Sequence, residues 1–305
     1  MDAALELEGV AKRYGDFQAV QDLSFAVARG SICGFLGPNG AGKTSTLRMI
    51  LGLTPASAGR IQVLGAPDGR QVRDRIGFLP EERGLYRKIT PVDAITFFAG
   101  LKGVPTGEGR RRARALLEAQ GLAASMHKPM KALSKGMAQK VQLIAAVAHE
   151  PELVILDEPF SGLDPVNQQG LEEMIRGLAA RGATVLFSTH VMQHAERLCE
   201  KVVLMAGGRK VFEGSVAEAR NAAPRFLQID GPIAAAAVSA LPGVAAVESI
   251  DVGEGLMAHR ASLATGADPN AALRAAFAQG LDVRRFEVRE PSLHDAFIVL
   301  TGGGR

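Results

Sequence analysis

Cysteine and aromatic side chains are scarce in this 305-residue sequence, which has two cysteines, two tyrosines and no tryptophan. Cys33 and Cys199 are too few for the disulfide framework of a small secreted protein. Neither lies near another cysteine or a histidine at the spacing of metal ligands. Both lie in apolar stretches, so we expect them to be packing residues in a reducing cytosol.

Long apolar runs are also missing. The longest, such as residues 143–148 and 233–241, are far shorter than the roughly 18 residues that a membrane-spanning helix requires. The N-terminus has no basic segment followed by an apolar one, so it does not resemble a signal peptide. We therefore expect a soluble chain, whose role at a membrane, if it has one, depends on a partner.

A strong excess of one charge is absent as well, because the formal net charge is only +3. The basic residues are spread along the chain, which does not favour nucleic acid as a partner. The densest basic run, GRRRAR at 109–114, starts an expected helix. We interpret it as a solvated helix face rather than a binding patch.

Strands and helices alternate over the first 220 residues, which implies a parallel sheet. Gly15 and Asp16 mark a turn between two early strands. Thr90, Pro91 and Asp93 form the start signal of a helical region, with a cap, a first-turn proline and an early acid. We expect strands at 5–14, 18–27, 32–37, 60–65, 75–81, 153–157, 183–190, 201–208 and 209–214, helices at 43–51 and 168–180, and a mostly helical segment over 90–148.

The residues after Pro224 have a different order of expected elements, namely strand, helix, hairpin, helix, strand and a final helix. This βαββαβ order predicts a small ferredoxin-like sandwich. The expected elements are 226–230, 232–241, a hairpin of 244–252 and 256–262 around Gly253-Glu254-Gly255, then 268–279, 281–288 and 292–300. We find no catalytic cluster of acids, histidines or cysteines there and expect a dimerisation or regulatory module.

A glycine-rich loop lies between an expected strand and an expected helix. Its sequence fits the pattern G-x-x-x-x-G-K-[ST], whose backbone N–H groups surround phosphates at a helix N-terminus. The lysine is expected to reach the terminal phosphates, and the threonine to offer its hydroxyl to Mg²⁺. The residues are Gly37, Pro38, Asn39, Gly40, Ala41, Gly42, Lys43 and Thr44.

Two adjacent acids end the apolar strand LVILD. Asp157 is placed to bind Mg²⁺ directly or through water. Glu158 is placed to polarise an attacking water as general base. A solvated strand end is the other interpretation, but the four apolar residues before these acids and Pro159 after them argue against it.

His190 follows the strand ATVLFST. A single histidine is usually structural, yet ligands in open α/β sheets gather at the carboxyl ends of strands. Spacing alone leaves both interpretations of His190 open.

Taken in order, these motifs resemble the ATP-binding subunit of an ABC transporter over about residues 4–220. Residues 37–44 are similar to the Walker A loop and 153–158 to Walker B, with Glu158 as the catalytic acid. The resemblance makes His190 the switch histidine, places Asp164 in the D-loop SGLD, and adds Ser45 to the ATP site. Tyr14 matches the aromatic residue that stacks on adenine, although it also fits an ordinary residue at a strand end.

The segment LSKGM at 133–137 aligns with the family signature LSGGQ. The resemblance implies that Ser134, Lys135, Gly136 and Met137 close over the ATP of a second copy in a head-to-tail dimer. Residues alone support part of this, because a serine at a helix start offers donors to an anion. Lys135 either attracts the γ-phosphate or points to solvent, and we favour solvent.

Lys135 and Met137 depart from the family's Gly and Gln, and Glu81 stands where the family has Gln. A carboxylate at position 81 can still approach Mg²⁺, so the implied metal residues are Thr44, Glu81 and Asp157.

The resemblance implies an α/β fold: a P-loop ABC cassette over 1–221, with a mixed core sheet, an antiparallel β subdomain and a helical subdomain, then a small α+β domain over 222–305. GFLPEERGLY and EPSLHDAFIVLTG resemble exporter-type sodium-extrusion or drug-resistance ATPases. We therefore expect an ATP- and Mg²⁺-dependent ATPase on the cytoplasmic face of the membrane. It would drive a separately encoded permease, contacted through residues 82–90 and the helices after them. The alternative is an ABC-type ATPase acting on ribosomes or DNA, but such relatives usually carry two cassettes or long coiled coils.

Overall fold

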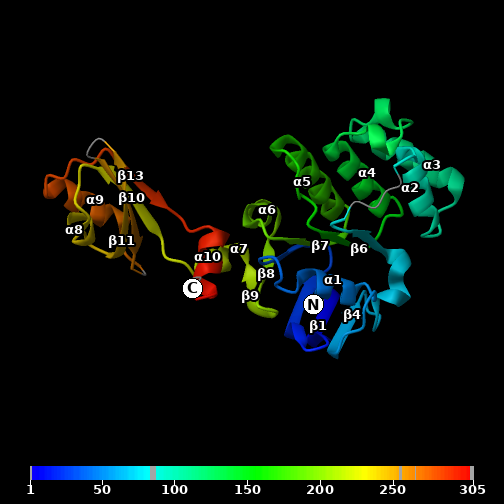
Figure 1. The fold of residues 1–305 in the computed structure, drawn as a ribbon, viewed down its shortest axis with the longest axis horizontal. Coiled ribbons are helices and arrows are strands. Elements are labelled where there is room, and N and C mark those ends of the chain that lie inside the picture. Colours follow the sequence, from blue (N-terminus) through cyan, green and yellow to red (C-terminus); the bar gives the residue numbers. More distant parts are fainter. Residues whose placement is uncertain (1, 83–86, 254–255, 265, 303–305) are drawn as a thin grey trace. The chain divides into compact units, whose positions relative to one another are not determined.

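The computed structural model describes residues 2–82, 87–253, 256–264 and 266–302 (Figure 1). The chain divides into two compact units, Met1–Val216 and Ala217–Arg305. Among the described residues, no helix combines the length and the apolar character needed to cross a membrane.

The first unit contains two sheets in the described part of the chain. An antiparallel sheet has the order β2-β1-β4, and a six-stranded sheet has the order β5-β6-β7-β3-β8-β9, parallel except for β9. The expected mixed core sheet and antiparallel β subdomain are therefore confirmed. The strands are β1 (Ala3–Tyr14), β2 (Phe17–Ala28), β3 (Ile32–Leu36), β4 (Ala58–Val63), β5 (Ile76–Leu79), β6 (Leu153–Asp157), β7 (Thr184–Thr189), β8 (Lys201–Ala206) and β9 (Arg209–Ser215).

The central strands of the parallel sheet are apolar almost throughout because both of their faces are covered. Every residue of β6 and β7 is buried, and so are the last four of β3. The polar residues at the carboxyl ends of these strands are therefore exceptions, and we expect them to have a functional role.

Helices complete the first unit. The segment expected to be helical over 90–148 contains α2 (Pro91–Gly100), α3 (Thr106–Ala119) and α4 (Lys135–Val147), with 3₁₀ turns at Ala123–Ser125 and Met130–Ala132 and a separate apolar core. Thr90 caps α2 as predicted. The other helices are α1 (Lys43–Ile50), the 3₁₀ helix Gly69–Arg75, α5 (Pro165–Ala180), α6 (Met192–Leu198) and α7 (Val216–Arg220), which enters the second unit.

Several predicted boundaries were wrong. The strand expected over 60–65 covers Ala58–Val63, and the strand expected over 281–288 begins only at Arg285. The helix expected from residue 168 begins at Pro165, because Asp164 caps it and a proline is tolerated in the first turn. The strand expected over 75–81 is limited to Ile76–Leu79.

The second unit is an antiparallel sheet of order β11-β12-β10-β13, with α8 and α9 supplying core residues on one face. This strand order and the βαββαβ connection confirm the ferredoxin-like prediction. The helix expected over 232–241 covers only Ala235–Ser239, and the turn Gly253-Glu254-Gly255 lies partly outside the described residues. The elements are β10 (Phe226–Gly231), α8 (Ala235–Ser239), β11 (Val244–Gly253), β12 (Leu256–Leu263), α9 (Pro269–Ala278), β13 (Arg285–Arg289) and α10 (Leu293–Leu300).

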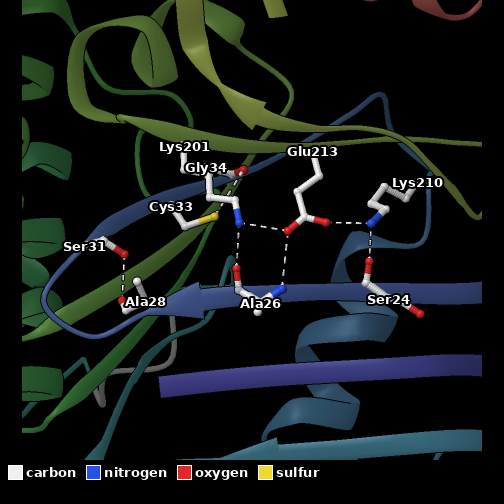
Figure 2. Close-up of polar contacts among 9 residues, drawn as sticks. All are labelled: Ser24, Ala26, Ala28, Ser31, Cys33, Gly34, Lys201, Lys210 and Glu213. Carbon is white, nitrogen blue, oxygen red and sulfur yellow. Dashed lines mark hydrogen bonds and ion pairs between the residues drawn. The ribbon is translucent and has the colours of Figure 1, made fainter. Parts of the chain in front are cut away.

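A charged cluster joins the edge strands of the two sheets of the first unit (Figure 2). Glu213 of β9 accepts hydrogen bonds from Lys201 at 2.9 Å and from Lys210 at 2.6 Å. The two lysines also donate to the backbone carbonyls of Ala26 and Ser24 on β2. Burial alone would raise the pKa of Glu213, but the two lysines outweigh it and lower the pKa. The cluster thus satisfies backbone groups along the edge of β2 that no neighbouring strand pairs.

We expect Glu213→Gln to lower the free energy of unfolding of the first unit by about 1–3 kcal/mol, because it leaves two partly buried ammonium groups without their carboxylate. Urea unfolding measures the loss. Glu8→Gln, at an exposed position of β1, is the matched control. Equal midpoints for the two variants would show that the cluster contributes nothing to stability.

Candidate functional site

The glycine-rich loop joins β3 to α1, as the sequence predicts. Gly40 has φ +80° and Gly42 has φ +96°, values that glycine adopts without strain. A Cβ at Gly42 would also lie 2.6 Å from the carbonyl oxygen of Ala19. Because Gly42 occupies the N-cap of α1 without a capping side chain, the first amides of the helix keep their partial positive charge for an anion.

A cavity of about 340 Å³ opens beside this loop. Its size and its backbone amide groups suit a phosphate-bearing ligand. The lining residues are Phe17, Ala19, Asn39, Gly40, Ala41, Gly42, Lys43, Thr44, Ser45, Glu81 and Glu158.

Lys43 and Glu158 face each other in this cavity. The Lys43 side chain is 6 % exposed and donates to the carbonyls of Gly37 at 2.6 Å and Pro38 at 3.1 Å. Its Nζ lies 3.6 Å from Glu158 Oε1, and His190 Nδ1 lies 3.0 Å from the same oxygen. Neither of these two groups makes a well-aligned hydrogen bond to Oε1, so this buried oxygen keeps a lone pair for another donor.

Ser188 of β7 holds the two acids that end β6. Its hydroxyl donates to Asp157 and accepts from the Glu158 N–H at 3.2 Å. The Ser188 carbonyl accepts from the same N–H at 3.1 Å. Glu158 has φ +47°, a strained value for a residue with a side chain, which persists only where its surroundings hold it.

The residues around the cavity fit a magnesium ion bound together with phosphates. Thr44 and Glu81 line the cavity and offer oxygen ligands, whereas Asp157 is buried behind it against Ser188. In the described part of the chain, no three acids, histidines or cysteines form a metal cluster of their own. Thr44 and Glu81 supply two oxygen donors, which suits an ion that takes its other ligands from a nucleotide and water.

Tyr14 and Phe17 lie opposite each other across the β1–β2 hairpin. Phe17 lines the cavity, but Tyr14 is outside the lining, and its ring is covered by Lys12 Nζ at 4.8 Å from the centroid. Sequence reasoning missed Phe17. The sequence feature that could have indicated Phe17 is a large apolar side chain directly after the turn. Phe17 is 64 % exposed in the structure.

The signature residues lie at the start of α4. Ser134 caps the helix and accepts from the Met137 N–H at 3.3 Å, as predicted for a helix start. None of Ser134, Lys135, Gly136 and Met137 lines the cavity beside Lys43. The chain thus does not bring its signature to its own phosphate loop.

The signature instead contacts the D-loop segment of the same chain. Asn167 donates its side-chain amide to Asp164 at 2.6 Å, and a Cβ at Gly136 would overlap the Asn167 side chain. The pKa of Asp164 is lowered, mainly by the Asn167 backbone N–H that it caps. Lys135 is exposed, yet its ammonium group lies over Gly162, where a Cβ would overlap it.

The sequence is similar to those of known proteins. A sequence profile of the ABC transporter family matches residues 20–161, and a profile of the C-terminal domain of DrrA1-3-like ATP-binding proteins matches residues 214–301. An uncharacterized ABC transporter ATP-binding protein of Bacillus subtilis strain 168, YhaQ, is 38 % identical over 299 residues, 98 % of each chain. The Nod factor export ATP-binding protein I of Ralstonia nicotianae is 39 % identical over 213 residues, 69 % of this chain and 66 % of that protein.

Solved structures of ABC transporter ATP-binding proteins also resemble this chain. An ATP-binding subunit of an ABC transporter matches with TM-score 0.66 and 34 % identity, covering 72 % of this chain and 92 % of that one. The cbiO1 protein of Clostridium perfringens, described as part of the ABC transporter complex cbiONQ, matches with TM-score 0.62 and 28 % identity, covering 70 % and 89 %.

Phe17→Ala is expected to weaken ATP binding by about 1–2 kcal/mol, because it removes an aromatic platform from the cavity. Tyr14→Ala is expected to change binding less. Displacement of a fluorescent ATP analogue measures both, with Phe97→Ala, outside the cavity lining, as control. A larger loss for Tyr14→Ala would place the base on Tyr14 and contradict the role of Phe17.

Proposed function

Because this chain belongs to the ABC transporter family of ATP-binding subunits, which are ATPases, we propose that it drives a separately encoded membrane exporter by ATP-dependent dimerisation. The observation that carries the dimer is the separation of the signature residues 134–137 from the cavity of their own chain. A signature without a phosphate to contact in its own chain is explained by a second copy that supplies one.

In this proposal, the phosphates lie against the amides of residues 40–45, and Lys43 leaves its loop carbonyls to contact them. Thr44 and Glu81, with Asp157 behind them, would hold Mg²⁺, which supplies neutralising positive charge to the phosphates. Glu158 accepts the proton of the attacking water, and His190 orients the Glu158 carboxylate from 3.0 Å.

Ser134→Arg in a Glu158→Gln background tests the dimer. Glu158→Gln alone should bind ATP, stop turnover and dimerise with ATP, because it lacks the base but keeps the binding groups. Adding Ser134→Arg should leave ATP binding by the monomer unchanged and prevent dimerisation, because the arginine fills the space of the partner's nucleotide. Light scattering with and without ATP measures the association.

Ala124→Arg is the matched control, since it adds the same side chain at an exposed position of the same helical region. A Ser134→Arg chain that still dimerises, or a Glu158→Gln chain that still releases phosphate at the normal rate, would contradict the proposal.

The membrane partner is proposed to bind the helical region beside α2. Phe97 is 49 % exposed and Leu101 is 65 % exposed, one turn apart at the end of this helix. The preceding segment, residues 82–90, is the other expected contact, and its residues 83–86 lie outside the described residues. Such a contact would keep the chain peripheral on the cytoplasmic face of the membrane.

The direction of transport is proposed from similarity, since several relatives are named for Nod factor export. Residues 222–305 are proposed to be an accessory domain for dimerisation or regulation. An ATPase acting on ribosomes or DNA is not favoured, because the similar proteins are named as transporter subunits.

Phe97→Ser with Leu101→Ser is expected to reduce co-sedimentation with membranes that contain the permease of the neighbouring reading frame by roughly tenfold, since two exposed apolar contacts are lost. ATP binding should be unchanged. The same double change at Val166 and Phe277, also exposed, is the control. Undiminished co-sedimentation would remove α2 from the interface.

A further inference from the structure

His194 is a buried histidine for which the mechanism above has no use. It lies on α6, which begins two residues after His190. The residue is 4 % exposed and contacts two other parts of the first unit. Its ring stacks on Phe160 at 4.1 Å between centroids and 20° between planes, and its Nδ1 lies 3.2 Å from Glu172 Oε1. An ionised carboxylate only accepts, so Nδ1 is the ring nitrogen that donates in this contact.

The two partners of His194 belong to segments that follow predicted site residues. Phe160 comes two residues after Glu158 and also packs edge-on against Phe187 of β7, at 5.9 Å and 88°. Glu172 lies on α5, the helix that Asp164 caps. One imidazole therefore joins the helix after the switch histidine to the segment after Glu158 and to the helix after the D-loop.

The carboxylate of Glu172 is held in place by this contact. Glu172 is 3 % exposed, and a carboxylate buried to this extent needs partners. Two arginines neutralise it from a longer range, Arg197 at 3.7 Å and Arg176 at 3.8 Å. His194 lies closer, at hydrogen-bond distance, so the ring fixes where the carboxylate points.

Glu158, Phe160, His190 and His194 line one cavity of about 420 Å³, separate from the phosphate loop. Space beside Phe160 gives its ring room to move if the imidazole is lost. Such movement would reach Glu158 through two peptide units, and the strained backbone of Glu158 depends on its surroundings.

We propose that His194 is a positioning residue for ATP hydrolysis: it fixes Phe160 and α5 so that Glu158 and His190 keep their geometry. The proposal rests on the assignment of Glu158 as general base. Because it concerns orientation and not nucleotide contact, the loss should fall on kcat and leave ATP affinity unchanged.

The test uses three variants of the full chain. His194→Ala removes both contacts, His194→Phe keeps the stacking, and His194→Gln keeps an amide near Glu172. Phosphate release gives kcat and KM, displacement of a fluorescent ATP analogue gives the Kd, and urea unfolding gives the folded fraction. Gln193→Ala, exposed on the same helix and lining the same cavity, is the control.

We expect His194→Ala to lower kcat roughly 10- to 100-fold with the Kd for ATP within about twofold, since small displacements of reacting groups have effects of this size. His194→Phe and His194→Gln should each recover part of the rate. Should His194→Ala fail to fold, the other two variants decide. A normal kcat for folded His194→Ala, or for both His194→Phe and His194→Gln where His194→Ala does not fold, would overturn the proposal. Weaker ATP binding with an unchanged kcat would overturn it as well. Full turnover by Glu158→Gln would instead refute the assignment of the base, whatever the His194 variants do.

Discussion

The contact among Lys43, Glu158 and His190 is the constraint on which the site depends. These residues come from three different segments: the start of α1, the end of β6 and the end of β7. Their side chains meet around one carboxylate oxygen because β3, β6 and β7 are neighbouring parallel strands whose carboxyl ends share an edge. Any shift of one strand relative to another would separate them. The complete burial of β6 and β7 opposes such a shift, since a slip of one residue would move apolar side chains out of their packing.

A buried carboxylate between a lysine and a histidine also defines what a nucleotide must do on entry. Phosphates bring negative charge close to Glu158, and Lys43 is the group that can turn from its loop carbonyls to meet them. The Lys43 ammonium group loses its hydrogen bonds to the loop carbonyls when it turns to the phosphates, so only the difference between the two sets of contacts contributes to the affinity. His190, 46 % exposed, moves at less cost than the buried Lys43.

Local patterns explain why the fold was largely predictable from the sequence. Thr90, Ser134 and Asp164 cap helices with their own side chains, so their signals need no knowledge of distant residues, although the cap at Asp164 was overlooked. Phe17 and Ser188 were not predicted as site residues, because their contacts depend on residues that are distant in the sequence. Phe17 reaches the cavity only because the hairpin lies beside the phosphate loop, and the Ser188 contact with Asp157 joins residues 31 positions apart. Contacts across strands of a parallel sheet have no signature in the chain.

Lys135, one of the two departures of the segment 133–137 from the family signature, has a physical explanation in the segment SGLD. Lys135 lies over Gly162, and Gly162 has φ +63° in addition to lacking the Cβ that would overlap the lysine. Gly136 likewise leaves room for Asn167, which Asp164 holds by two hydrogen bonds. The starts of α4 and α5 are thus fitted to each other by paired small and large residues. Lys135 therefore fits the glycine of SGLD in the same chain. Its ammonium group adds positive charge where the N-termini of α4 and α5 already converge. If a second copy presents its phosphates to this surface, Lys135 strengthens an attraction that Ser134 and the helix amides begin, without having to leave its place over Gly162.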